Sequence, residues 1–185
     1  MRSATSLAIL IVLATCATNG LAQGNKSKPK PDFSGTWEFD RKRGNVGKSN
    51  SASPPEQITI THQDPELKIR KTVTLTGQKE ERELTYYTDG RGETNPTTAW
   101  ITANLGSESG RPPETKSKTS WSGDRVVTRS IFRTSVGGAL MQFEITVERR
   151  ISSDGKTLTE TTHTNSLFTP GPGFDFKAVY NLVSK

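Results

Sequence analysis

Residues 31–44 read PDFSGTWEFDRKRG, and this stretch decides the fold that the sequence predicts. Side chains in it alternate with a period of two residues, which is the repeat of a β-strand. One face of the predicted strand carries Phe33, Gly35, Trp37 and Phe39. The preceding segment is rich in lysine, serine and proline and has nothing to bury. A strand that holds one of the three tryptophans of the chain therefore opens the predicted folded domain.

The same alternation recurs to the end of the chain, in runs rich in threonine, valine and isoleucine, which favour strands. No segment shows a convincing helical period. Turn pairs separate the runs, and Gly-containing pairs between alternating runs are strong hairpin signals. The pairs with glycine include Asp89-Gly90, Gly123-Asp124 and Asp154-Gly155, and Asp64-Pro65 is a turn pair without glycine. The pattern predicts about nine or ten strands, nearly all joined by short hairpins.

A meander of this size has two edge strands that must be hidden, and closure into a barrel removes both. We therefore predict an all-β fold, a single up-and-down antiparallel β-barrel of about 8–10 strands. The alternative is a sandwich of two sheets, which usually needs long crossover connections. Only residues 91–114, a long segment rich in glycine, proline and serine, could form one. We expect this segment at the rim of the barrel.

The stretch DFSGTWEFD resembles the first strand of the calycin superfamily, which includes the lipocalins and the fatty-acid-binding proteins. Still closer is the similarity to lipocalin-like proteins secreted by some environmental bacteria, and it covers most of residues 32–183. At Gly35 the absent side chain would allow a close approach between strands. Trp37 would close one end of the barrel with its ring, whose N–H needs a polar partner. The resemblance places a cation from the last strand beside this ring, and Lys177 is the one available.

The faces of the predicted strands suggest a mixed lumen. In residues 139–152 the apolar set contains Phe143 and Ile145, and we expect it to point inward. Residues 156–166 are polar on both faces, so this strand lies either at an edge or beside a partly wet cavity. Such a lining suits an amphipathic ligand. The candidate lumen residues are Tyr86, Phe132, Phe143, Ile145 and Tyr180.

The last strand departs from the fatty-acid-binding pattern. That family ends with an Arg-x-Tyr pair that holds a carboxylate, whereas residues 178–180 read Ala-Val-Tyr here. Fatty-acid binding of that type is therefore in doubt. A carboxylate could instead be held by Arg129, Arg133 or Arg149, and the sequence does not decide which of them face inward.

The leading hypothesis is a barrel that carries a small hydrophobic or amphipathic molecule without transforming it. One alternative is an interaction module of the cell envelope, with a filled barrel that acts through its loops. A less favoured alternative is an enzyme with its site in the lumen. We expect a monomer with no metal or cofactor. His62 and His163 are interpreted as ordinary strand residues and not as haem ligands.

The first 22 residues have the charged start, apolar run and small residues of a secretory signal peptide, with cleavage near Ala22. The protein would then be secreted or periplasmic. A lipoprotein anchored at Cys16 is the rival interpretation. We expect a linker at residues 23–32 and the barrel domain at 33–185, with no transmembrane segment. The formal charge of +6 is spread along the chain, which does not favour nucleic-acid binding.

Overall fold

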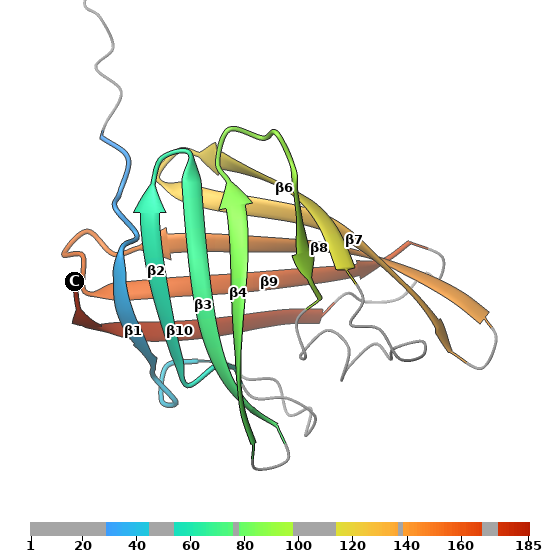
Figure 1. Ribbon diagram of the computed structural model, residues 1–185, viewed down its shortest axis with the longest axis horizontal. Coiled ribbons are helices and arrows are strands. Elements are labelled where there is room, and N and C mark those ends of the chain that lie inside the picture. The colour runs from blue at the N-terminus through green and yellow to red at the C-terminus, as the bar shows by residue number, and fades with distance from the viewer. Residues whose placement is uncertain (1–28, 45–53, 76–77, 98–113, 137–138, 168–173) are drawn as a thin grey trace, which may run out of the picture.

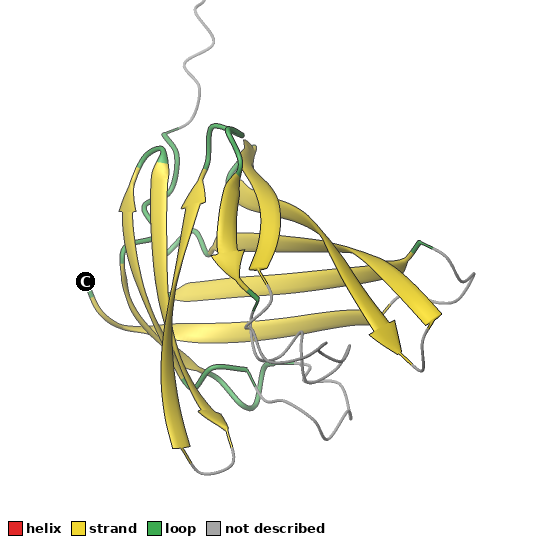
Figure 2. Ribbon diagram, turned by 45° about the vertical axis from the view of Figure 1, so that its right-hand side comes forward, coloured by secondary structure: helices red, strands yellow, loops and turns green. Residues whose placement is uncertain are grey.

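The computed structural model describes residues 29–44, 54–75, 78–97, 114–136, 139–167 and 174–185. Within these residues the chain forms ten strands and no helix (Figures 1 and 2). The strands are β1 (Gly35–Phe39), β2 (Gln57–Gln63), β3 (Glu66–Leu75), β4 (Gln78–Tyr87), β5 (Glu93–Pro96), β6 (Glu114–Ser122), β7 (Arg125–Val136), β8 (Ala139–Ile151), β9 (Thr157–Ser166) and β10 (Phe174–Ser184).

All ten strands belong to one antiparallel sheet, in the order β4-β3-β2-β1-β10-β9-β8-β7-β6-β5. Strands that follow each other in the sequence pair in the sheet, except β4 and β5, which lie at the two ends of the order. The first strand, β1, pairs with the last, β10. Figure 1 shows this sheet curled into a barrel, with the far ends of β7 and β8 projecting beyond the other strands. The predicted all-β, up-and-down antiparallel barrel is confirmed.

The two ends of the sheet, β4 and β5, meet through side chains. The Thr85 amide donates to Oδ1 of Asn95 at 2.8 Å, and Nδ2 of Asn95 donates to the Thr85 carbonyl at 2.7 Å. Farther along, the Tyr87 amide donates to Oε2 of Glu93 at 3.3 Å. Side chains of β5 thus satisfy backbone groups of β4 that would otherwise form an open edge.

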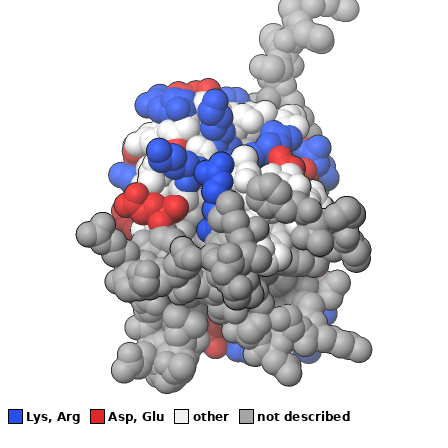
Figure 3. Space-filling model, turned by 90° about the vertical axis from the view of Figure 1, so that its right-hand side faces the viewer, with Lys and Arg blue, Asp and Glu red and all other residues white. Residues whose placement is uncertain are grey.

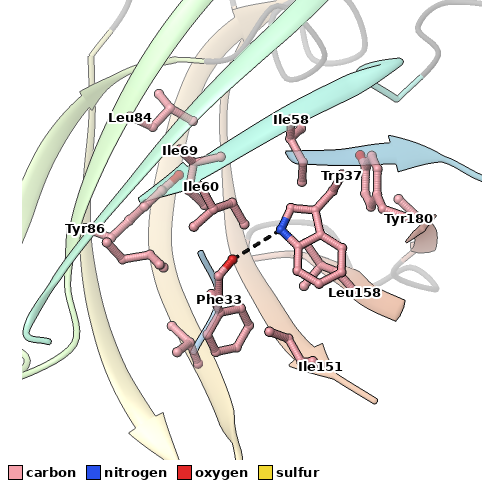
Figure 4. Close-up of a cluster of buried hydrophobic side chains, with 13 residues drawn as sticks. Phe33, Trp37, Ile58, Ile60, Ile69, Leu84, Tyr86, Ile151, Leu158 and Tyr180 are labelled. Atoms are coloured by element: carbon pink, nitrogen blue, oxygen red, sulfur yellow. Dashed lines mark hydrogen bonds between the residues drawn. The ribbon is translucent and has the colours of Figure 1, made fainter. Parts of the chain in front are cut away.

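One end of the barrel is closed by Trp37. Its side chain is fully buried, and its indole N–H donates to the Phe33 carbonyl at 3.2 Å (Figure 4). Around it, Phe33 and apolar side chains from seven strands complete a packed base: Ile58, Ile60, Leu67, Ile69, Leu84, Tyr86, Val126, Ile151, Leu158, Ala178 and Tyr180. Trp37 is therefore part of the packed apolar base.

Gly35 lies where β1 approaches β10 most closely. Its φ of +140° is unfavourable for residues with a side chain. A Cβ at this position would lie 2.8 Å from Cδ1 of Leu182 and 2.9 Å from the Ser184 carbonyl oxygen. A side chain would therefore separate the two strands whose pairing joins the halves of the sheet.

The residues before β1 lie against the barrel. Lys30 forms an ion pair with Asp64 at 2.9 Å, and its Nζ lies 5.1 Å from the ring centre of Trp121. Asp64 also accepts a hydrogen bond from the Trp121 indole at 2.9 Å. Part of the segment expected to be a linker is therefore attached to the domain.

Several predicted turns are confirmed. Gly123 and Gly155 have positive φ in the turns that join β6 to β7 and β8 to β9. The segment predicted as the long loop 91–114 contains one further strand, β5, and its residues 98–113 lie outside the described part of the chain. The expected signal peptide and Cys16 also lie outside it. In the described residues, no helix has the length and hydropathy of a membrane span.

Candidate ligand site in the barrel interior

A layer of charged side chains lies inside the barrel, above the apolar base. It consists of Lys71 from β3, Arg149 from β8 and Glu160 from β9, and we call it the charged layer. Nζ of Lys71 lies 3.3 Å from Oε1 of Glu160, and Nε of Arg149 lies 2.9 Å from Oε2. All three side chains are at least nine-tenths buried. One carboxylate therefore binds two cations, and the layer has a net positive charge.

The protonation of the charged layer follows from its geometry. Burial opposes ionisation of Glu160, but the charges of Lys71 and Arg149 outweigh it and lower the pKa of this carboxyl to about 2. Burial, together with the charge of Arg149, lowers the pKa of Lys71, although the pairing with Glu160 opposes this shift. Glu160 is therefore ionised at neutral pH, and it is the group that makes two buried cations tolerable.

Two tyrosines face the charged layer. The guanidinium carbon of Arg149 lies 4.9 Å from the ring centre of Tyr86, within cation–π range. Tyr180 is fully buried, and its hydroxyl has no hydrogen-bond partner among the described residues. Burial raises the pKa of Tyr180 well above its usual value, and Glu160 adds to this shift. A neutral phenol with an unused donor and acceptor thus lies beside buried charges.

Farther from the base, the inward side chains of β9 are polar, whereas those of β8 are apolar. Thr162 and Thr164 follow Glu160 along β9, and both are buried. The Thr164 hydroxyl also has no partner among the described residues. A second apolar cluster lies at this level and is formed by Phe132, Phe143 and Ile145, with Met141 and Val147 packed against it. This part of the interior offers both apolar contact and free hydrogen-bonding capacity.

A chain of hydrogen bonds connects the charged layer to the junction between β4 and β5, which we call the seam. Nη1 of Arg149 donates to the Thr128 hydroxyl at 3.0 Å, and this hydroxyl lies 2.9 Å from that of Thr119. Thr119 in turn donates to Oε1 of Glu93 at 2.8 Å. Glu93 is the residue whose other oxygen accepts from the backbone of Tyr87. The inner wall formed by β5, β6 and β7 is therefore polar.

The five predicted lumen residues all lie on inward positions and are all buried: Tyr86, Phe132, Phe143, Ile145 and Tyr180. They do not form one site. Both tyrosines belong to the base cluster, whereas the other three residues form the second cluster.

Lys177 does not lie beside Trp37, which corrects the role that the resemblance implied. Trp37 pairs with Leu182, and the even-numbered residues of β10 point inward. Because side chains alternate along a strand, the odd-numbered Lys177 points outward, and it is exposed. The Phe33 carbonyl serves as the polar partner of the indole instead.

The sequence reasoning missed the charged layer. Lys71 follows Leu67 and Ile69 at the spacing of alternate residues and therefore lies on the inward face of β3, where a lysine is unexpected. The edge-strand alternative for residues 156–166 is wrong, because β9 pairs with β8 on one side and β10 on the other. Its polar inward face is the signal that could have revealed Glu160.

The structure shows which of the three candidate arginines face the barrel interior. Arg149 is 2% exposed and points inward, whereas Arg129 and Arg133 are exposed on the outer face of β7. Of the histidines, His163 forms an outer ion pair with Asp175 at 2.8 Å. His62 is buried beside the rings of Phe33 and Trp121. Among the described residues, no group of three or more His, Cys, Asp or Glu side chains could hold a metal ion.

The chain matches no protein-family model, and no curated protein matches its sequence significantly. The class is therefore defined by the fold and by the interior site. The protein is a ten-stranded antiparallel β-barrel with a packed base and a buried charged layer inside it.

Proposed function

We propose that this protein binds a small amphipathic molecule inside its barrel, without transforming it, as a secreted lipocalin-like carrier. The polar end of the ligand would lie at the charged layer, and its apolar part would lie against Phe132, Phe143 and Ile145. The fold supports the proposal, because closed antiparallel barrels of this size commonly hold one small ligand.

The observation that carries the proposal is the pair of unused hydroxyls inside the barrel. Buried polar groups almost always have a hydrogen-bond partner, and each exception requires an explanation. Tyr180 and Thr164 have none among the described residues. Tyr180 is opposite Leu158 and Thr164 is opposite Phe174, so the two residues lie about 20 Å apart along the neighbouring strands β10 and β9. An elongated ligand would be needed to reach both hydroxyls, and a shorter one would satisfy one of them.

The energetic cost of the buried charged layer also supports ligand binding. A buried ion pair rarely stabilises a fold more than apolar side chains of similar volume would. A cluster of Lys71, Arg149 and Glu160 in an interior that is otherwise apolar at its base is therefore better explained by a polar ligand than by stability.

The experiment measures the binding of the fluorescent amphipathic probe 1-anilinonaphthalene-8-sulfonate to the folded protein. Thr164→Phe places a large ring in the proposed chamber, and we expect it to weaken binding at least tenfold. Asn165→Phe is the matched control, since it adds the same ring at the next residue of β9, which is exposed. We expect the control to bind the probe within twofold of the wild type.

A cooperative thermal transition in each variant shows that it has folded. Folded wild-type protein that fails to bind the probe would contradict the proposal. Equal binding by the wild type and the folded Thr164→Phe variant would contradict it as well, because the probe would then bind elsewhere.

A further inference from the structure

A groove of about 980 Å³ crosses the outer face of β5, β6, β7 and β8, outside the barrel interior. Four exposed cations line it: Lys116, Lys118, Arg129 and Arg133. We call this feature the basic groove. Ile131 lies between the two arginines on β7 and is 48% exposed. Figure 3 shows one side of the molecule, on which basic side chains gather over its upper part with smaller acidic groups beside them.

Two of the cations face each other directly. Lys118 on β6 is the register partner of Arg129 on β7. Side chains opposite each other in an antiparallel pair lie about 4.5–5.5 Å apart at Cβ, and like charges at this separation are destabilising. The fold therefore maintains an unfavourable pair at the centre of the basic groove.

Within the described residues, the cations of the groove form no ion pairs, unlike their neighbours on the same hairpin. Arg125 pairs with Glu148 at 2.7 Å, and Arg150 pairs with Asp124 at 2.8 Å. No hydrogen bond or ion pair within the described residues involves the side chain of any groove cation. Glu93 also lines the groove, but its carboxylate accepts hydrogen bonds from Ser117 and Thr119, and Glu144 is the other acidic residue of the lining.

The described lining of the groove carries four cations and two carboxylates, Glu93 and Glu144. An acidic ligand would bring complementary charge to this surface.

We propose that the basic groove binds an extended acidic peptide segment of a partner protein. Alternate residues on a strand lie about 6.5–7 Å apart, and the acidic side chains on one face of an extended peptide repeat with the same spacing. Ile131, between Arg129 and Arg133, would contact one apolar side chain of the peptide. Among the described residues of the lining none is aromatic, and a single-stranded nucleic acid would favour aromatic surfaces for base stacking.

The experiment measures fluorescence anisotropy of a labelled peptide, Glu-Val-Glu-Val-Glu-Val-Glu, with the full chain at low salt. We expect the Lys118→Glu/Arg129→Glu double variant to bind at least tenfold more weakly than the wild type. The matched control is Lys156→Glu/Lys177→Glu, which makes the same charge change at exposed lysines outside the groove. We expect the control to bind within threefold of the wild type.

Equal weakening in both double variants would overturn the proposal, because the attraction would then depend on net charge and not on the groove. Tighter binding of a twelve-residue oligothymidylate or a sulfated oligosaccharide than of the peptide would overturn the choice of partner. Neither outcome bears on the interior site, because the four cations of the groove point to the outer face of the sheet, away from the charged layer.

Discussion

The side-chain amide of Asn95 takes the place of a neighbouring strand for the backbone of Thr85. It accepts from the Thr85 amide at 2.8 Å and donates to the Thr85 carbonyl at 2.7 Å. Asn95 is 7% exposed, so water cannot readily replace either bond. One side chain thus closes the barrel where the ends of the sheet meet.

Asn95→Ala should lower the free energy of unfolding by about 2–4 kcal/mol, because two backbone groups lose their partners in a buried place. Urea unfolding followed by circular dichroism measures the change. Asn165→Ala is the control, since Asn165 is exposed on β9, and its effect should stay within about 0.5 kcal/mol. Equal effects of the two variants would show that the seam does not depend on the amide.

Glu160→Gln should destabilise the protein by about 3–5 kcal/mol, because it leaves two buried cations without their counter-charge. Glu148→Gln is the matched control, because Glu148 pairs with Arg125 near the surface, where ion pairs contribute about 0–1 kcal/mol. Chemical unfolding of both variants provides the comparison. A small effect of Glu160→Gln would mean that Lys71 and Arg149 are solvated.

Acid should remove part of the stability through the same carboxyl. The pKa of Glu160 is about 2 in the folded protein, below the usual value of 4.5. Its contribution is therefore fully present above about pH 4.5 and is lost as the pH falls toward 2, and it amounts to roughly 3 kcal/mol. Unfolding free energies between pH 3 and 7 should fall more steeply in the wild type than in Glu160→Gln. Parallel curves would contradict the assignment.

Tyr180→Phe should stabilise the ligand-free protein by about 1 kcal/mol or more, because it removes a buried hydroxyl that has no partner. The same change should weaken the binding of 1-anilinonaphthalene-8-sulfonate by about 3- to 10-fold if that hydroxyl contacts ligand, since about 1 kcal/mol corresponds to a factor of five. Tyr87→Phe is the control, because it removes the same hydroxyl from a partly exposed ring that lies against Arg91, outside the candidate site. Loss of stability in Tyr180→Phe would show that the hydroxyl has a partner after all.

Lys118→Glu should raise the melting temperature, because it places opposite charges face to face across β6 and β7 where like charges now stand. The expected gain is about 0.2–1 kcal/mol, as for other cross-strand charge pairs. Lys156→Glu makes the same change outside the basic groove. An equal gain there would attribute the effect to net charge alone.

The sequence could predict the closed barrel because its local signals agree with each other. The alternation around Trp37 and the turns at Gly123 and Gly155 each depend on neighbouring residues, and hairpins bring only neighbours together. The seam could not be predicted in this way. Asn95 contacts Thr85 only because the whole sheet curls, and no local pattern records that closure.

In the candidate site, too, local patterns predicted some residues and missed those that depend on contacts between distant strands. Alternation correctly placed Phe143 and Ile145 inside, since these residues follow one strand. The charged layer combines Lys71, Arg149 and Glu160 from three strands. Within one strand, a charged residue at an inward position contradicts the alternation of apolar and polar side chains, and its partners lie on strands that the local pattern does not connect. The wrong expectation for Lys177 came from the resemblance, whereas its odd position on β10 already indicated the outer face.

The most direct test of the central claim is native mass spectrometry of the protein purified from its own source. The account predicts one small amphipathic molecule bound per chain in the wild type and in Asn165→Phe, and none in folded Thr164→Phe. A bound molecule that Thr164→Phe retains, or wild-type protein that carries none and takes up no 1-anilinonaphthalene-8-sulfonate, would contradict it.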